Sequence, residues 1–146
     1  MTDDEIYMRR ALALARLQNG RTGKNPAVGC IILNAEGRVI SEAATGDSGR
    51  PHAEQLALSR LQPGQAAGGT AYVTLEPCIE RSTGEASCST QLIDADLARV
   101  VVAALDPHPQ GAGGVKRLQD AGLIVDAGLM EAEAEALYEV FFSSIS

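Results

Sequence analysis

The sequence has few aromatic and few cationic residues. Of its 146 residues only 3% are aromatic and none is tryptophan, so we expect a core of alanine, valine, leucine and isoleucine. Lysine and arginine number 12 against 19 acidic residues, which gives a formal net charge of -7. Because such a chain repels phosphate backbones, the composition argues against a nucleic-acid partner. There is also no apolar run long enough to span a membrane, which argues against a membrane partner.

Cysteine and histidine are scarce as well. The chain has three cysteines and two histidines, and its acidic start, Met1 to Glu5, has no apolar signal region. These features predict a cytoplasmic location. There, a small and odd number of cysteines indicates metal binding or free thiols rather than disulfides.

The hydrophobic pattern predicts alternating helices and strands in one domain, residues 1–146. Thr2 and Glu5 form a candidate capping box, and Asn19-Gly20 ends the first helix. Further helices are expected at 52–61, 88–95, 115–121 and 131–142, and strands at 28–33, 38–42, 70–75, 99–104 and 123–125. An initial hairpin followed by alternating strands and helices predicts a three-layer α/β/α fold with a mixed central sheet.

The chemistry is concentrated in two short motifs. Pro51-His52-Ala53-Glu54 is followed by Glu76-Pro77-Cys78 and by Cys88. One histidine and two cysteines are suitable zinc ligands, and three protein ligands leave the open position typical of a catalytic site. Zinc lowers the pKa of a water held there, and Glu54 is placed to carry its protons. Zinc base deaminases carry H-x-E with P-C-x-x-C, although here nine residues separate Cys78 from Cys88.

Less specific interpretations exist for each motif. An isolated H-x-E is more often a pair of surface residues, and Cys78 and Cys88 taken alone are consistent with buried free thiols. The combination favours zinc. Cys30 differs from the other cysteines, because it lies in an apolar strand and is expected to be a small core residue.

A third motif, Asn25 to Cys30, opens the first predicted strand. An asparagine just before a strand can form hydrogen bonds with the donor and acceptor atoms on the edge of a heterocyclic ring. A lone Asn, however, is more often a turn residue. Gly29 permits a close approach of backbone or ligand.

Together these motifs resemble the deaminase domain of the bifunctional deaminase/reductase of riboflavin biosynthesis, within the cytidine-deaminase-like superfamily. The resemblance covers almost the whole chain and also includes residues 100–107. It implies that His52, Cys78 and Cys88 bind zinc, that Glu54 is the proton shuttle, and that Asn25 and Asp106 hold substrate. Ala53 and Glu76, which adjoin the zinc ligands, are also predicted to contact substrate.

The resemblance is weakest in the loops around the site. The family usually has a histidine where this chain has Ala43 to Thr45, and it prefers asparagine at the position of His108. The segment 79–87 is one residue longer than usual and lacks the usual histidine and proline. Arg81, with Arg21, Lys24 and Arg50, is a candidate for binding a substrate phosphate, although surface charges are an equally good interpretation. We expect His108 to lie in the site wall.

The sequence therefore predicts a zinc-dependent hydrolytic deaminase of a small heterocycle. The resemblance implies the diaminohydroxyphosphoribosylaminopyrimidine of riboflavin biosynthesis as substrate, with no reductase domain in this chain. A related enzyme for another pyrimidine, purine or triazine-like ring remains open, as does an inactive zinc-stabilised binding module. A polynucleotide deaminase is disfavoured by the acidic charge. We expect a homodimer or a larger homo-oligomer.

Overall fold

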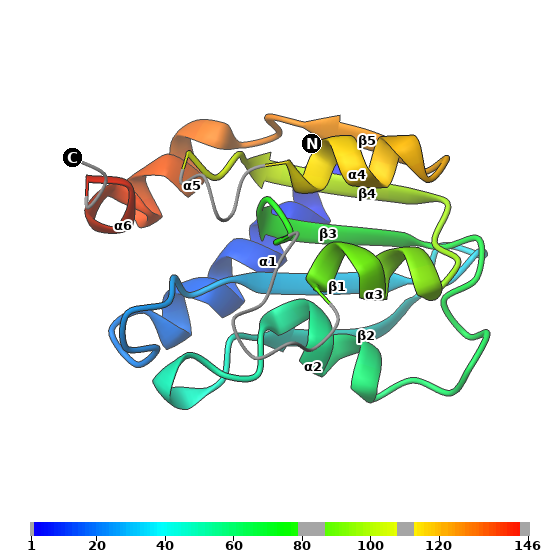
Figure 1. Cartoon of the computed structure of the whole chain (residues 1–146), viewed down its shortest axis with the longest axis horizontal. Coiled ribbons are helices and arrows are strands. Elements are labelled where there is room, and N and C mark those ends of the chain that lie inside the picture. Colours follow the sequence, from blue (N-terminus) through cyan, green and yellow to red (C-terminus); the bar gives the residue numbers. More distant parts are fainter. Residues whose placement is uncertain (1, 79–86, 108–112, 144–146) are drawn as a thin grey trace.

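The computed structural model describes residues 2–78, 87–107 and 113–143, and its centre is a mixed five-stranded sheet (Figure 1). The strand order is β2-β1-β3-β4-β5. β1 pairs antiparallel with β2 and β3, whereas β3–β4 and β4–β5 are parallel pairs. The strands are β1 Gly29–Leu33, β2 Val39–Ala44, β3 Thr70–Leu75, β4 Arg99–Ala104 and β5 Ile124–Ala127.

Helices cover both faces of the sheet. α1 packs on β1 and β3 and lies behind the sheet in Figure 1, while α2, α3 and α4 cross its near face. The described helices are α1 Asp3–Gln18, the 3-10 helix η1 Asp47–Gly49, α2 Ala53–Ser59, α3 Cys88–Asp94, α4 Gly114–Asp120, α5 Glu131–Leu137 and α6 Glu139–Ser143. Within the described residues, none of these helices combines the length and the apolar character needed to cross a membrane.

The third layer is completed by the end of α5. Residues two apart in a strand share a face, and Tyr72 and Thr74 of β3 are such a pair. The Tyr72 hydroxyl donates to Asp4 of α1 at 2.6 Å, and the Thr74 hydroxyl lies 2.6 Å from the Tyr138 hydroxyl. α1 and the α5–α6 junction therefore lie on the same face, and the expected three-layer α/β/α fold is confirmed.

The core is aliphatic, as the composition predicts. β1 is buried along its whole length, and β3 and β4 are buried except at their first residues. Their valine, isoleucine and alanine side chains are short, so α1 must lie close to the sheet to pack against them. Gly29 permits this approach, because a Cβ there would lie 1.9 Å from the carbonyl oxygen of Ala11. The close approach that the sequence predicts at Gly29 is thus made by the backbone of α1.

The capping box predicted at the start of α1 is present. The Thr2 hydroxyl accepts from the Glu5 backbone N–H at 3.2 Å, and the Glu5 carboxylate accepts from the Thr2 N–H at 3.2 Å. Two N–H groups that the first turn leaves unpaired are satisfied in this way. Cys30 is fully buried in β1, so its predicted place in the core is confirmed.

Several expected boundaries are wrong by one or two residues, and two of the differences affect the site. The helix expected at 131–142 is interrupted at Tyr138, which leaves helical geometry (φ -99°, ψ 10°) and separates α5 from α6. Its hydroxyl donates to the carbonyl of Ala27 at 2.8 Å, a distant contact that periodicity cannot reveal. His52 was expected as the first residue of a helix but is the N-cap residue that precedes α2, with an extended backbone.

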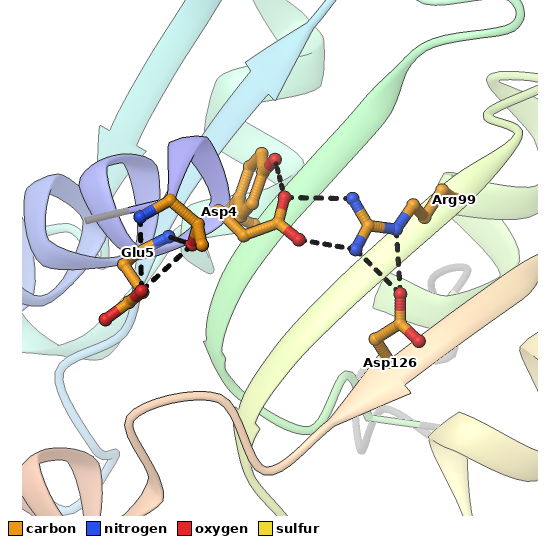
Figure 2. Close-up of polar contacts among 6 residues, drawn as sticks. Asp4, Glu5, Arg99 and Asp126 are labelled. Carbon is orange, nitrogen blue, oxygen red and sulfur yellow. Dashed lines mark hydrogen bonds and ion pairs between the residues drawn. The ribbon is translucent and has the colours of Figure 1, made fainter.

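A network of charged residues joins the start of α1 to the sheet (Figure 2). Arg99 of β4 donates to both carboxylate oxygens of Asp4, at 2.9 and 2.7 Å, and its Nε donates to Asp126 of β5 at 2.8 Å. The hydrogen bonds from Arg99 lower the pKa of Asp4; the bond from Tyr72 adds to this effect and partial burial opposes it. Planar bidentate pairing of this kind is specific to arginine.

We predict that Arg99→Lys destabilises the protein by about 1–3 kcal/mol, since a lysine cannot make the paired bonds to Asp4 and also reach Asp126. Because the folded-state pKa of Asp4 is lowered from 3.8, its contribution is present above that value and lost as pH falls through the folded value. Denaturant unfolding at pH 7 and at pH 3 measures both effects.

Lys116→Met is the matched control. Lys116 pairs with Asp120 at 3.0 Å, but the two side chains are 79% and 66% exposed, so its loss is expected to cost less than about 0.5 kcal/mol. An Arg99→Lys variant as stable as this control would show that the network contributes little.

Candidate functional site

The candidate site lies at the carboxyl ends of the parallel strands β3 and β4. β3 leads directly into Glu76-Pro77-Cys78, and β4 leads into Leu105 and Asp106. The starts of α2 and α3 reach the same edge and bring His52 and Cys88. In α/β folds this edge is where ligands bind, because the connecting loops diverge there.

Three potential zinc ligands converge at this edge. The Nδ1 atom of His52 lies 3.3 Å from Sγ of Cys88 and 4.0 Å from Sγ of Cys78, and all three atoms lie within 4.8 Å of one another. Ligand atoms around a tetrahedral zinc ion are roughly 3.5–3.8 Å apart. The three donors therefore fit zinc in both chemical type and spacing.

Cys78 has the properties of a thiolate. Hydrogen bonds from the Cys88 thiol and from His52 and the Cys88 backbone N–H lower its pKa to about 4, although burial opposes them. The Cys88 N–H donates to Cys78 Sγ at 3.3 Å, and Ser87 caps the same helix by accepting from the Thr90 N–H at 3.2 Å. A thiolate is the form that binds zinc, so Cys78 is prepared for a metal.

Glu54 lies in the first turn of α2 and is buried, with 4% of its surface exposed. Its pKa is raised from 4.5 to about 7, mainly by burial and also by the nearby Cys78 thiolate. Its own backbone N–H, His52 and Cys88 partly oppose these effects. A carboxyl group with a pKa near neutrality can both accept and release a proton at physiological pH, as a proton shuttle requires.

His52, Glu54, Cys78 and Cys88 line one small cavity of about 100 Å³. The lining mixes polar and apolar side chains; its other described members are Asn25, Pro26, Val28, Thr45, Leu75, Glu76, Asp106 and Phe141. A flat, partly polar ring is the kind of ligand that such a lining suits.

Asn25 lies at the cavity wall with its amide held in one orientation. Its Nδ2 donates to the carbonyl of Gly49 at 3.0 Å, and the Gly49 α-carbon approaches too closely to allow a side chain there. Among the described residues no group donates to the Asn25 Oδ1. The wall therefore presents a fixed hydrogen-bond acceptor.

The other predicted contact residues differ in their surroundings. Asp106 lines the cavity and is 9% exposed. Glu76 also lines it, but its carboxylate accepts backbone N–H groups of Asp106, Gly113 and Val115. The Ala53 side chain is fully buried and belongs to the hydrophobic core cluster. The substrate contacts predicted for these three residues stay predictions.

Arg81 and His108 lie outside the described residues, so their predicted roles stay predictions. The cations Arg21, Lys24 and Arg50 are exposed on loops that flank Asn25 and His52. Lys24 lines a neighbouring groove between residues 19–27 and the α5–α6 segment. A phosphate-binding role for these side chains stays a prediction as well.

Thr45 and Phe141 are among the residues of the cavity wall that the sequence did not predict as site residues. Thr45 follows β2, and its hydroxyl accepts from the Val28 N–H at 2.9 Å. Phe141 reaches the site because Tyr138, one turn earlier, bonds to Ala27 and Thr74. The Thr45 contact spans 17 residues, and the two Tyr138 contacts span 64 and 111 residues. No short sequence motif predicts contacts of this kind.

The comparisons with known proteins agree with this geometry. Residues 1–104 match the model of the cytidine and deoxycytidylate deaminase zinc-binding region. The chain is 48% identical to riboflavin biosynthesis protein RibD of Escherichia coli over 94% of its length, and it spans only 37% of that protein. It is 37% identical over 96% of its length to the diaminohydroxyphosphoribosylamino-pyrimidine deaminase of Buchnera aphidicola, and covers 94% of that enzyme.

A solved structure shows the same fold. RibD of Acinetobacter baumannii superimposes with a TM-score of 0.89 at 40% identity, covering 98% of this chain and 40% of the other. The region matched by the family model contains His52, Glu54, Cys78 and Cys88. This chain belongs to the family of zinc-dependent deaminases that share the cytidine and deoxycytidylate deaminase zinc-binding region.

Proposed function

We propose that this chain hydrolyses the amino group of the phosphorylated diaminohydroxypyrimidine intermediate of riboflavin biosynthesis. The central observation is the position of Glu54, buried in the same cavity as His52, Cys78 and Cys88. The name of the Buchnera aphidicola relative, which matches along nearly its full length, supports the substrate. The RibD relatives are more than twice as long as the matched region, so only the deamination is proposed here.

Zinc held by His52, Cys78 and Cys88 would supply an ionised water at neutral pH. Glu54 would take the proton of that water, since its pKa is near 7 and it faces the same cavity. It would deliver that proton to the ring nitrogen next to the attacked carbon. It would then take the second proton of the added water, from the hydroxyl now on that carbon, and pass it to the amino group, which leaves as ammonia as the C–N bond breaks and the C=O bond forms. Its burial excludes bulk water, which would otherwise compete for these protons.

The walls of the cavity would orient the ring. The fixed Oδ1 of Asn25 can accept a hydrogen bond from an amino group or ring N–H, and the Asp106 carboxylate can accept another. Phe141 offers an aromatic face to the ring. Pairing of donors with fixed acceptors discriminates strongly between ring types, because an unpaired buried polar group is costly.

We further propose that residues 1–146 act as one deaminase domain in the cytoplasm, as a homodimer or larger homo-oligomer. The net charge of -7 supports a small-molecule substrate over a nucleic acid. A zinc-stabilised binding module without catalysis is less consistent with the site, since zinc binding alone needs no buried carboxylate such as Glu54.

Zinc content provides the first test. We predict about one zinc ion per chain, and loss of most of it in Cys88→Ser, because a hydroxyl does not replace a thiolate ligand. Cys30→Ala is the matched control, since Cys30 is buried in β1 and belongs to no group of candidate ligands among the described residues. Full zinc occupancy in Cys88→Ser would remove Cys88 from the site.

Glu54→Gln tests the proton shuttle. The amide keeps the shape of the side chain but cannot accept and release a proton, so we expect unchanged zinc content and a loss of turnover of about 10²–10⁴-fold. Glu36→Gln, on the exposed hairpin turn, is the control and should leave turnover unchanged. Comparable rates for the two variants would contradict the mechanism.

The substrate is tested by complementation. We predict that the chain, expressed with a separate reductase, restores growth of a riboflavin-requiring strain that lacks its own deaminase, and that the Glu54→Gln variant does not. Ammonia release from a panel of amino-heterocycles, with and without phosphate, is measured in parallel. Absence of growth, with rapid deamination of a different ring, would overturn the substrate assignment and leave the reaction class intact.

A further inference from the structure

Glu76 is a buried carboxylate that the proposed reaction does not use. It lies two residues before the zinc ligand Cys78 and is 8% exposed. Its Oε1 accepts from the Asp106 N–H at 3.1 Å, and its Oε2 accepts from the N–H groups of Gly113 and Val115 at 3.1 and 3.0 Å. One side chain therefore accepts hydrogen bonds from three backbone N–H groups, one just after β4 and two at the start of α4.

The three bonds connect the Glu76 side chain to two separate segments of the chain. Asp106 follows β4, whereas Gly113 and Val115 belong to the start of α4. The Glu76 N–H also donates to the carbonyl of Ala104 at 2.9 Å, which extends the β3–β4 pairing past the end of the strands. Asp106 is thus bound to the turn that carries Cys78, both through the sheet and through the Glu76 side chain.

A close backbone contact supports the same connection independently. A Cβ on Gly114 would lie 1.8 Å from the Pro77 carbonyl oxygen and 3.4 Å from Cγ of Glu76. The start of α4 therefore packs directly on the Glu76-Pro77 turn, at a distance that only glycine permits. The carboxylate of Glu76 satisfies the N–H groups on either side of this contact, Gly113 and Val115.

We propose that Glu76 is a positioning residue for the deamination: it fixes Asp106 at a set distance from the zinc ligands, and so sets how tightly the ring is bound. The proposal rests on the proposed function, in which Asp106 holds the substrate. A carboxylate suits the task because it has only acceptor oxygens and can take all three N–H groups at once.

Glu76→Gln changes this arrangement with little change in shape. The amide has one acceptor oxygen, and its NH₂ group must face at least one of the three N–H donors. The orientation that keeps Gly113 and Val115 bonded turns the NH₂ group toward Asp106. An unsatisfied buried donor is costly, and we expect KM to rise about tenfold, with kcat within about threefold of the original value and zinc content unchanged.

A double-mutant cycle with Asp106→Asn separates positioning from general stability. If Glu76 acts through Asp106, Glu76→Gln changes KM by less than about twofold once Asp106 has become Asn. If the KM increase of the double variant equals the product of the increases in the two single variants, the proposal is contradicted. Glu42→Gln is the matched control, because Glu42 pairs with Arg10 on the surface and lies outside the site. It should change neither KM nor kcat.

Amide hydrogen exchange tests the contact without any turnover. Glu76→Gln should accelerate exchange of the Asp106 N–H, while the Cys88 N–H, bonded to Cys78, keeps its protection. Unchanged exchange at Asp106, or a collapse of kcat with KM unchanged, would overturn the positioning role. If the original chain fails to deaminate the pyrimidine, the substrate assignment fails, whereas the exchange result still decides whether Glu76 holds Asp106.

Discussion

The parallel pairing of β3 with β4 is the constraint on which the site depends. It brings two chain segments out of the sheet at one edge, one carrying Glu76 and Cys78 and the other carrying Asp106. The starts of α2 and α3 meet the same edge with His52 and Cys88. A site with residues from four separate segments keeps its geometry only if the sheet fixes their relative positions, and the buried aliphatic strands provide this rigidity.

The electrostatics of the site follow from this convergence. Close donors lower the pKa of Cys78 to about 4, and burial, together with the resulting thiolate, raises the pKa of Glu54 to about 7. Thus the same arrangement shifts the pKa values of Cys78 and Glu54 in opposite directions. Paired groups whose environments separate their pKa values are typical of acid–base catalysts.

The sequence predicted those parts of the molecule that depend on local pattern. The three candidate zinc ligands, which the structure brings together, and Glu54 lie in short motifs with specific spacing, and the strands at 70–75 and 99–104 were predicted with correct bounds. Contacts between distant segments were not predictable. Thr45 and Phe141 reach the cavity through tertiary packing, and the break at Tyr138 accompanies a bond to Ala27, 111 residues away. Glu76 adjoins a motif, but nothing in the sequence shows that its carboxylate meets backbone N–H groups.

The central claim is that three protein ligands hold zinc and leave one position open beside Glu54. X-ray absorption at the zinc edge of the purified protein tests it directly. The account predicts two sulfur ligands at about 2.3 Å and two lighter ligands at about 2.0–2.1 Å, one from His52 and one from solvent. A shell with four protein ligands, or with a single sulfur, would contradict the account.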